Sequence, residues 1–292
     1  MNNIFFPSKY PIVEAIMNPV SDLKLALAVA DSGGYPSLFN DGNSEKLNFL
    51  LSEFKKSIGN TNIVVCTHIQ SKDIIGFIKV IKKHKPSHCE IFCVDENGQK
   101  NNSILTDDKI SRLNLEMINR ISKTIVRLLE PQNLDLGVNA YAIKGKESAG
   151  LSGDYSVEEL FKIQKSITTN KPIIPYGGIG TAAQVRNYIN LGAEAVAIGT
   201  LFACAKESML SKEVKEKLIK SSSENLTKSS LNQNELVFKH VDKISDWNGS
   251  EELSNSIRGD GKSGFIYAGM GIDFIKKERS VKEIIEYLVS EL

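Results

Sequence analysis

Apolar and polar residues alternate in blocks along the first two hundred residues of the chain. Eight short runs are almost wholly apolar, as buried β-strands are, and apolar residues at helical spacing fill several of the segments between them. The runs predicted as strands are 11–17, 35–39, 63–69, 89–94, 124–129, 140–144, 172–176 and 195–199. Continuous rather than alternating apolar character indicates burial on both faces, which is typical of a parallel sheet.

Helices are predicted between these strands where apolar residues recur at helical spacing. The segment 44–58 is the clearest, because Leu47, Leu50, Leu51 and Phe54 fall on one face. The other predicted helices are 22–32, 72–83, 157–167 and 181–191. Regular alternation of strand and helix favours a closed (β/α)8 barrel, an α/β fold of about 250 residues, over an open doubly wound sheet.

Two stretches depart from this alternation. Residues 95–122 begin with a polar loop and contain a helix of only moderate periodicity. Residues 211–262 are rich in Ser, Lys, Glu and Asn, with one helical piece near 213–220, and are predicted as a helical insertion or lid after the eighth strand. An amphipathic helix at 281–292 closes the chain. The predicted barrel domain therefore consists of residues 1–210 and 263–292.

Composition and charge are those of a globular protein that acts on small molecules. Hydrophobic residues make up 41% and charged residues 24% of the 292 residues, and the formal net charge is +1. This balance gives no electrostatic reason to expect nucleic acid or an anionic membrane as a partner. We see neither a signal-peptide pattern nor an apolar run near the ~20 residues of a membrane span. Four cysteines in apolar stretches, without a CxxC pair, predict buried thiols and a cytoplasmic location.

Two glycine turns late in the chain predict a phosphate site. Gly177 and Gly178 follow the seventh predicted strand, and Gly199 and Thr200 follow the eighth. Glycine lets the backbone approach an anion closely, and Thr181 is placed to cap a helix whose first N–H groups point at the ligand. In (β/α)8 barrels the loops after strands seven and eight often hold a phosphate.

Other interpretations of these turns stay open. Residues 178–183 match the dinucleotide fingerprint GxGxxA superficially, but that motif belongs to the first βα unit and needs an acidic residue after the next strand, whereas Glu194 precedes it. The glycines would otherwise only make tight turns. Because two such turns follow neighbouring strands, phosphate binding is favoured, with a flavin-free barrel acting on a sugar phosphate as an alternative function.

Several stretches, in order along most of the chain, resemble the nitronate monooxygenase (2-nitropropane dioxygenase) family of FMN-dependent TIM barrels, which is related to flavin-dependent enoyl-acyl-carrier-protein reductases. These stretches are PIVEAIM at 11–17, DSGG at 31–34, KGKESAGLSG at 144–153, PIIPYGGI at 172–179 and GAEAVAIGTLF at 192–202. The resemblance implies an FMN-dependent oxidoreductase with a small-molecule substrate and with NAD(P)H as a candidate reductant.

The resemblance also implies which residues contact the cofactor. Gly177, Gly178, Gly199 and Thr200 would bind the FMN phosphate. The residues implied around the rest of the flavin are Ala15, Ile16 and Met17 along the isoalloxazine ring, Thr67, His68 or Gln70 after the third strand, and Lys144, Glu147, Ala149 and Gly150 in the wall beside it.

The chain departs from the family at the expected catalytic base. The family's Gly-Gly-His segment supplies a histidine, and Leu151 stands at that position. Leucine cannot accept a proton, and general-base assistance is worth typically 10²–10⁴-fold. Three functions remain open: oxidation of nitronates, NAD(P)H-dependent reduction of an enoyl thioester, and a catalytically degenerate flavoprotein subunit. The degenerate flavoprotein would act as a subunit of a biosynthetic complex. A homodimer is a second candidate assembly for this chain.

Other polar residues offer less chemistry. His68 ends a predicted strand, so it is a candidate catalytic acid or base near neutral pH, or else a satisfied polar residue at the barrel rim. Tyr176 is a candidate hydrogen-bond donor, and Glu14 is interpreted as part of a solvated or rim ion pair. A proline between His84 and His88 breaks the helix that would align them, so no metal site is predicted.

Overall fold

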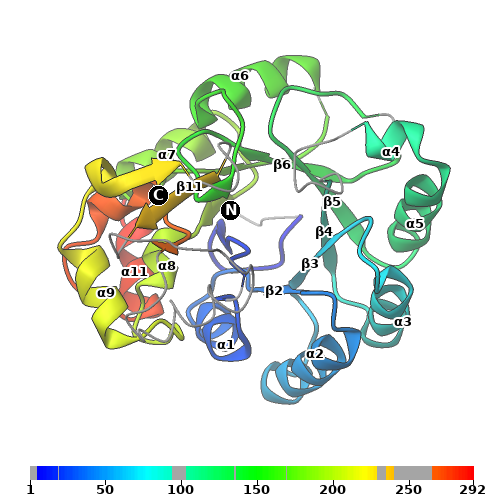
Figure 1. Cartoon of the computed structure of the whole chain (residues 1–292), viewed down its shortest axis with the longest axis horizontal. Helices are drawn as coiled ribbons and strands as arrows, with labels where there is room; N and C mark the ends of the chain where they lie inside the picture. The colour runs from blue at the N-terminus through cyan, green and yellow to red at the C-terminus, as the bar shows by residue number, and fades with distance from the viewer. Residues whose placement is uncertain are drawn as a thin grey trace.

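A sheet of eight parallel strands curves into a barrel with helices around it (Figure 1). The computed structural model describes residues 5–18, 20–93, 103–134, 136–168, 170–228, 235–239 and 265–292. The barrel strands are β1 (Ile12–Glu14), β2 (Ser37–Phe39), β3 (Val64–His68), β4 (His88–Phe92), β5 (Lys123–Leu128), β6 (Ala140–Lys144), β8 (Ile173–Tyr176) and β9 (Val196–Ile198). All eight lie at predicted strands, and the α/β barrel is confirmed.

The first two strands close the barrel. The order of strands around the sheet is β1-β9-β8-β6-β5-β4-β3-β2. A parallel bridge between Val13 and Tyr35 joins its two ends. Tyr35 donates its N–H to the carbonyl of Ile12, and Glu14 donates to the carbonyl of Tyr35, each at 2.8 Å. Closure brings the carboxyl ends of all eight strands to one mouth, where barrel enzymes place their chemistry.

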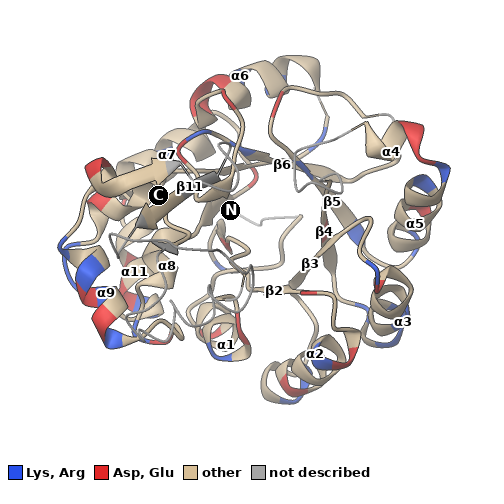
Figure 2. Ribbon diagram, in the orientation of Figure 1, with Lys and Arg blue, Asp and Glu red and all other residues tan. Residues whose placement is uncertain are grey.

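Most of the helices begin at a side chain that caps them, although α3 (Ile74–His84), α4 (Ile104–Asp107) and α8 (Thr200–Ala203) have no such hydrogen bond in the part of the chain that the structure describes. In the described residues they are α1 (Leu23–Asp31), α2 (Ser44–Ile58), α3 (Ile74–His84), α4 (Ile104–Asp107), α5 (Lys109–Asn119), α6 (Val157–Ile167), α7 (Ala182–Asn190), α8 (Thr200–Ala203), α9 (Lys212–Ile219) and α11 (Val281–Leu288). Ser156 and Thr181 form capping boxes at α6 and α7. Both signs of charge occur on the outer helices (Figure 2). No helix in these described ranges is long and apolar enough to cross a membrane.

The inside of the barrel is filled by its own side chains, apart from a space at the carboxyl end. Phe6 closes the amino end, with its ring 4.7 Å from that of Tyr35, whose hydroxyl lies 2.7 Å from Nδ1 of the buried His88. At the opposite end the small side chains of Ala15 and Ala197 face a cavity. Large side chains fill the amino end of the barrel, whereas small side chains leave space at the carboxyl end. A ligand can therefore enter at the carboxyl end.

A second, antiparallel sheet lies over the barrel and includes part of the predicted helical insertion. It is built from β7 (Gly150–Leu151), β10 (Leu226–Lys228), β11 (Glu235–Lys239) and β12 (Phe265–Ile266). The segment 211–262 does contain a helix, α9, but the prediction missed the strands β10 and β11. These strands are short, and β11 pairs with β7 more than eighty residues earlier, so no local pattern marks them.

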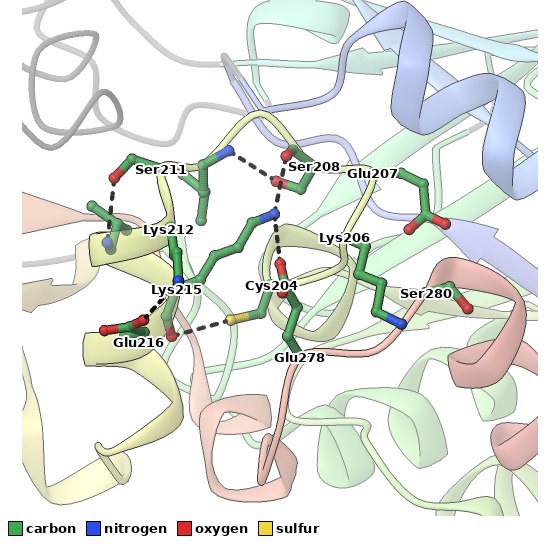
Figure 3. A network of polar contacts seen from close by, with 12 residues as sticks. Cys204, Lys206, Glu207, Ser208, Ser211, Lys212, Lys215, Glu216, Glu278 and Ser280 are labelled. Atoms are coloured by element: carbon green, nitrogen blue, oxygen red, sulfur yellow. Dashed lines mark hydrogen bonds and ion pairs between the residues drawn. The ribbon is translucent and has the colours of Figure 1, made fainter.

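A buried lysine anchors the first helix of this segment (Figure 3). The Nζ of Lys215, on α9, donates to the carbonyl of Ser208 and to Oε1 of Glu278, each at 3.2 Å. The thiol of Cys204 lies 3.7 Å from the Lys215 carbonyl oxygen. Helix α9 is thus fixed both to the turn that follows α8 and to the chain leading into α11.

Candidate active site

A cavity of about 360 Å³ lies at the carboxyl ends of the barrel strands. This volume falls in the range of small-molecule and cofactor pockets. The sequence-predicted residues that line the cavity are Ala15, Ile16, Met17, His68, Lys144, Glu147, Ala149, Gly150, Gly177, Gly178, Gly199 and Thr200. Segments that lie far apart in the sequence are therefore brought to one site.

The two glycine turns both line this cavity. Gly177 and Gly178 have φ values of 131° and 65°, and a β-carbon on Gly177 would lie 2.6 Å from the hydroxyl of Ser148. Within the described residues, the N–H groups of Gly178, Gly199 and Thr200 make no hydrogen bond. Backbone N–H groups without partners are the donors with which a pocket can bind an anion.

Side chains hold both turns in shape. Gln184 accepts hydrogen bonds from the N–H groups of Gly180 at 2.9 Å and Thr181 at 3.1 Å, and its amide nitrogen donates to the carbonyl of Gly178 at 3.4 Å. The Thr200 hydroxyl accepts from the N–H of Gly269 at 3.1 Å, which ties the second turn to the chain after β12. The N–H groups are therefore fixed before a ligand arrives.

The loop after β1 forms another side of the cavity. Its backbone is fixed because Ala15 donates its N–H to the carbonyl of Ile198 at 3.0 Å and Met17 donates to the hydroxyl of Ser21, also at 3.0 Å. Since β1 ends at Glu14, residues 15–17 are loop rather than the end of the strand that the sequence predicted.

The segment after β6 forms the opposite wall. Glu147 lines the cavity, but its Oε2 accepts the N–H of Val157 at 2.9 Å, at the start of α6. The Ser148 hydroxyl donates to the carbonyl of Tyr176 at 2.9 Å. Leu151 is half-buried and also lines the cavity. Its backbone pairs with Glu235 of β11, so the small sheet sets the position of this side chain.

His68 lies in the cavity but is not a base tuned to neutral pH. Its ring packs at a tilt of 47° against that of Phe92, with centroids 3.6 Å apart. Burial, with a smaller contribution from the charge of Arg127, lowers the pKa of His68 to about 4. The imidazole is therefore neutral at pH 7, which argues against a role that needs it to titrate near neutrality, and the assignment of His68 as a catalytic residue stays a prediction.

Two predicted contact residues lie outside the cavity lining. Thr67 is fully buried, and its hydroxyl accepts a hydrogen bond from the side-chain amide of Asn40 at 3.1 Å. Gln70 is exposed in the turn after β3. Neighbouring strand residues point to opposite faces, so of Thr67 and His68 only one can face the barrel interior, and the structure has His68 there.

The sequence analysis missed a charged network below this cavity. Arg127 of β5 lines the cavity, and its Nε donates to Oε1 of the buried Glu90 on β4 at 2.6 Å. Tyr176 of β8 donates its hydroxyl to Oε2 of Glu90, also at 2.6 Å. Although burial opposes its charge, the carboxylate of Glu90 raises the pKa of Arg127. A charged residue inside each of the apolar runs 89–94 and 124–129 was the available signal.

Comparisons with known proteins give one family and several similar structures. The sequence model of the family described as nitronate monooxygenase matches residues 50–235. No curated protein sequence matches the chain.

Three solved structures share the fold. FabK from Thermotoga maritima is 22% identical, with a TM-score of 0.80 over 99% of this chain and 94% of that chain. A nitroalkane oxidase from Streptomyces ansochromogenes is 16% identical, with a TM-score of 0.76 over 98% and 96%. The enoyl reductase domain of MlnA, from the macrolactin biosynthesis cluster of Bacillus amyloliquefaciens, is 12% identical, with a TM-score of 0.66 over 99% and 95%.

Proposed function

The chain belongs to the nitronate monooxygenase family, whose members are flavin-dependent oxidoreductases, and we propose that it binds FMN and oxidises nitronates. The observation that carries this proposal is the pair of glycine turns at one cavity. The N–H groups of Gly178, Gly199 and Thr200, which make no hydrogen bond within the described residues, are suited to a phosphate group.

The residues present fit the proposed cofactor. A β-carbon at Gly177 would collide with the hydroxyl of Ser148, so this position favours glycine. A turn without side chains lets a phosphate approach the backbone closely. The fixed backbone of Ala15, Ile16 and Met17 would lie along the flavin ring. Bound FMN would supply the electron acceptor for oxidation of the substrate.

The same walls limit which substrates can react. Leu151 has no atom that accepts a proton, and Glu147 is engaged by the N–H of Val157. His68, with a pKa of about 4, is a weak base. Substrate that arrives already deprotonated needs none of these groups. We therefore expect oxidation of nitronates and little turnover of neutral nitroalkanes, which must lose a proton first.

The visible spectrum of the purified protein, with and without added FMN, tests the cofactor site. We expect a bound flavin spectrum from the wild-type protein, and loss of FMN retention when Gly178 is replaced by leucine. Gly59→Leu is the matched control, because Gly59 also has a positive φ (82°) but lies at the end of α2, with open space where its β-carbon would be. Tight FMN retention by the Gly178→Leu variant would contradict the phosphate assignment.

Reduction of an enoyl thioester by NAD(P)H is the second candidate function. Two of the similar structures support it, FabK, an enoyl-acyl-carrier-protein reductase, and an enoyl reductase domain. Leu151 does not favour it, since this reaction must add a proton to the α-carbon of the substrate and leucine has none to donate. Anaerobic mixing separates the two reactions. Loss of flavin absorbance with a nitronate supports nitronate oxidation, and loss with NAD(P)H alone supports the reductase. A flavin that responds to neither would favour a catalytically degenerate subunit.

A further inference from the structure

Arg127 is a buried cation whose hydrogen bonds to the described residues all come from Nε and Nη2, the latter also reaching Sγ of Cys66 at 3.9 Å. Its side chain is 10% exposed and projects from β5 into the barrel interior. Nε donates to Oε1 of Glu90 at 2.6 Å, and Nη2 forms an ion pair with the same oxygen. The second oxygen of Glu90 accepts the hydroxyl of Tyr176 at 2.6 Å, so both carboxylate oxygens have partners and the carboxylate is locked in place.

The remaining arm of the guanidinium is open. Within the described residues Nη1 makes no hydrogen bond, while Arg127 lines the cavity. The guanidinium carbon lies 4.8 Å from the ring centroid of Phe92 and 5.7 Å from that of Tyr176, so two aromatic rings pack against the cation. A buried charge with unpaired N–H donors is costly unless a partner supplies the missing hydrogen bonds.

We propose that Nη1 of Arg127 binds an anionic oxygen of the substrate, which makes the floor of the cavity a second anion site, separate from the glycine turns. Glu90 is the positioning residue that aims the guanidinium, and Tyr176 holds Glu90. The proposal rests on the proposed function, since it concerns the same cavity. It identifies the substrate as a small oxyanion, such as a nitronate, one oxygen of which would accept hydrogen bonds from Nη1.

The charges around the cavity agree with this assignment. Lys144 adds a second cation to the lining, whereas the carboxylate of Glu147 is directed to the N–H of Val157. Stability alone gives no reason to keep the Glu90–Arg127 pair, because apolar residues of similar volume often replace a buried ion pair without loss. A role in binding a ligand does give one, because Arg127 lines the cavity and its Nη1 makes no hydrogen bond to the described residues.

Titration with nitrate, a planar oxyanion without redox reactivity toward flavin, tests the proposal. Nitrate is added to the FMN-loaded protein, and its dissociation constant is read from the change in flavin absorbance. The key variant is the double substitution Arg127→Met with Glu90→Gln, which removes both charges and leaves none unpaired. We expect nitrate to bind at least tenfold more weakly to it than to the wild type. Arg127→Lys, which keeps the charge but loses the planar fork, should fall between the two.

Arg186→Met is the matched control, because Arg186 lies exposed on α7 and pairs with Glu291 at 3.2 Å, away from the cavity. A tenfold loss in the double variant, with FMN retention and Arg186→Met unchanged, supports the proposal. Equal nitrate affinity in the wild type and the double variant overturns it, as does a wild type that does not bind nitrate. If nitrate affinity is equal and only the flavin reduction potential shifts, the arginine serves the reduced cofactor and the substrate assignment is wrong.

The FMN assignment and the role of Arg127 can be tested separately. A wild type that does not retain FMN contradicts the cofactor assignment alone. Calorimetric titration of the cofactor-free wild type and double variant with nitrate then decides whether Arg127 binds an oxyanion, by the same tenfold criterion.

Discussion

Two carboxyl side chains, Glu14 on β1 and Glu90 on β4, are both fully buried in the barrel, yet their surroundings differ completely. Glu90 forms an ion pair with Arg127 and accepts the hydroxyl of Tyr176. Glu14 accepts the N–H of Ser37 at 3.0 Å, and its other oxygen has no hydrogen-bond partner among the described residues. Burial raises the pKa of Glu14 to about 8, against the smaller opposing effect of the Ser37 N–H.

The comparison shows that burial alone does not decide whether a carboxyl group in this barrel is charged. Without a cation the buried acid is protonated at pH 7, and with one it forms a salt bridge that also fixes the arginine at the cavity. The interpretation of Glu14 as a solvated or rim ion pair was wrong, because the side chain is buried and makes no ion pair in the described structure.

Removing the cation gives the largest expected effect. Arg127→Met leaves the carboxylate of Glu90 buried without its partner, and we expect the free energy of unfolding to fall by about 3–5 kcal/mol. Urea denaturation measures this change. Adding Glu90→Gln should restore most of the loss, because the unpaired charge is then gone. A single variant as stable as the wild type would show that Glu90 needs no cation.

The pH dependence of stability tests Glu14. Its pKa is about 8 in the folded protein against 4.5 for the ordinary group, so folding holds a proton that the unfolded chain releases. The stabilisation is full below about pH 4.5 and is lost as the pH rises through 8, by on the order of a few kcal/mol. Glu14→Gln, which does not titrate, should flatten the unfolding free energy over this window. An unchanged slope would contradict a neutral Glu14.

Tyr176→Phe tests the other partner of Glu90. The change removes one hydrogen bond to a charged group, and we expect a loss of about 1.5–3 kcal/mol in unfolding free energy. Nitrate affinity should fall less than in the Arg127 double variant, since the arginine remains. Thermal unfolding and the nitrate titration together measure both effects. A larger loss of nitrate affinity than of stability would assign Tyr176 a direct contact with the anion.

The smallest effect is expected at a buried cation that touches no cavity. Lys215 is 7% exposed, but its partner Glu278 is 42% exposed and can be hydrated when the lysine is lost. We expect Lys215→Met to lower the unfolding free energy by about 1 kcal/mol and to leave FMN retention unchanged. Lys212→Met, at a side chain 90% exposed on the same helix, should change stability by less than about 0.5 kcal/mol. Loss of FMN in the Lys215 variant would tie α9 to the cavity.

Local pattern predicted most of the barrel and the glycine turns. The helix predicted at 44–58 has the same bounds as α2, because a capping side chain at Asn43 and a left-handed Gly59 mark its ends. The turns at Gly177 and Gly199 were found because strand order in a barrel determines which loops meet. The capping residues and the glycines each lie within a few residues of the helix end or turn that they predict.

Pairings between distant segments could not be predicted in this way. The run TIVRLL around Arg127 was interpreted only as a strand, and its partner Glu90 lies 37 residues earlier on the neighbouring strand. The pairing of Leu151 with Glu235 joins a two-residue strand to a segment far along the chain, where neither sequence has strand periodicity. Periodicity reports which face a residue occupies, but it does not report which distant residue lies opposite.

In the small sheet, β11 pairs with β12 on one side, where Phe238 lies opposite Ile266, and with β7 on the other, where Leu236 lies opposite Gly150. The position of Leu151 at the cavity therefore depends on residues that do not line the cavity. Evolution can reshape this wall by changing Phe238 or Ile266, without altering a single residue that a ligand would touch.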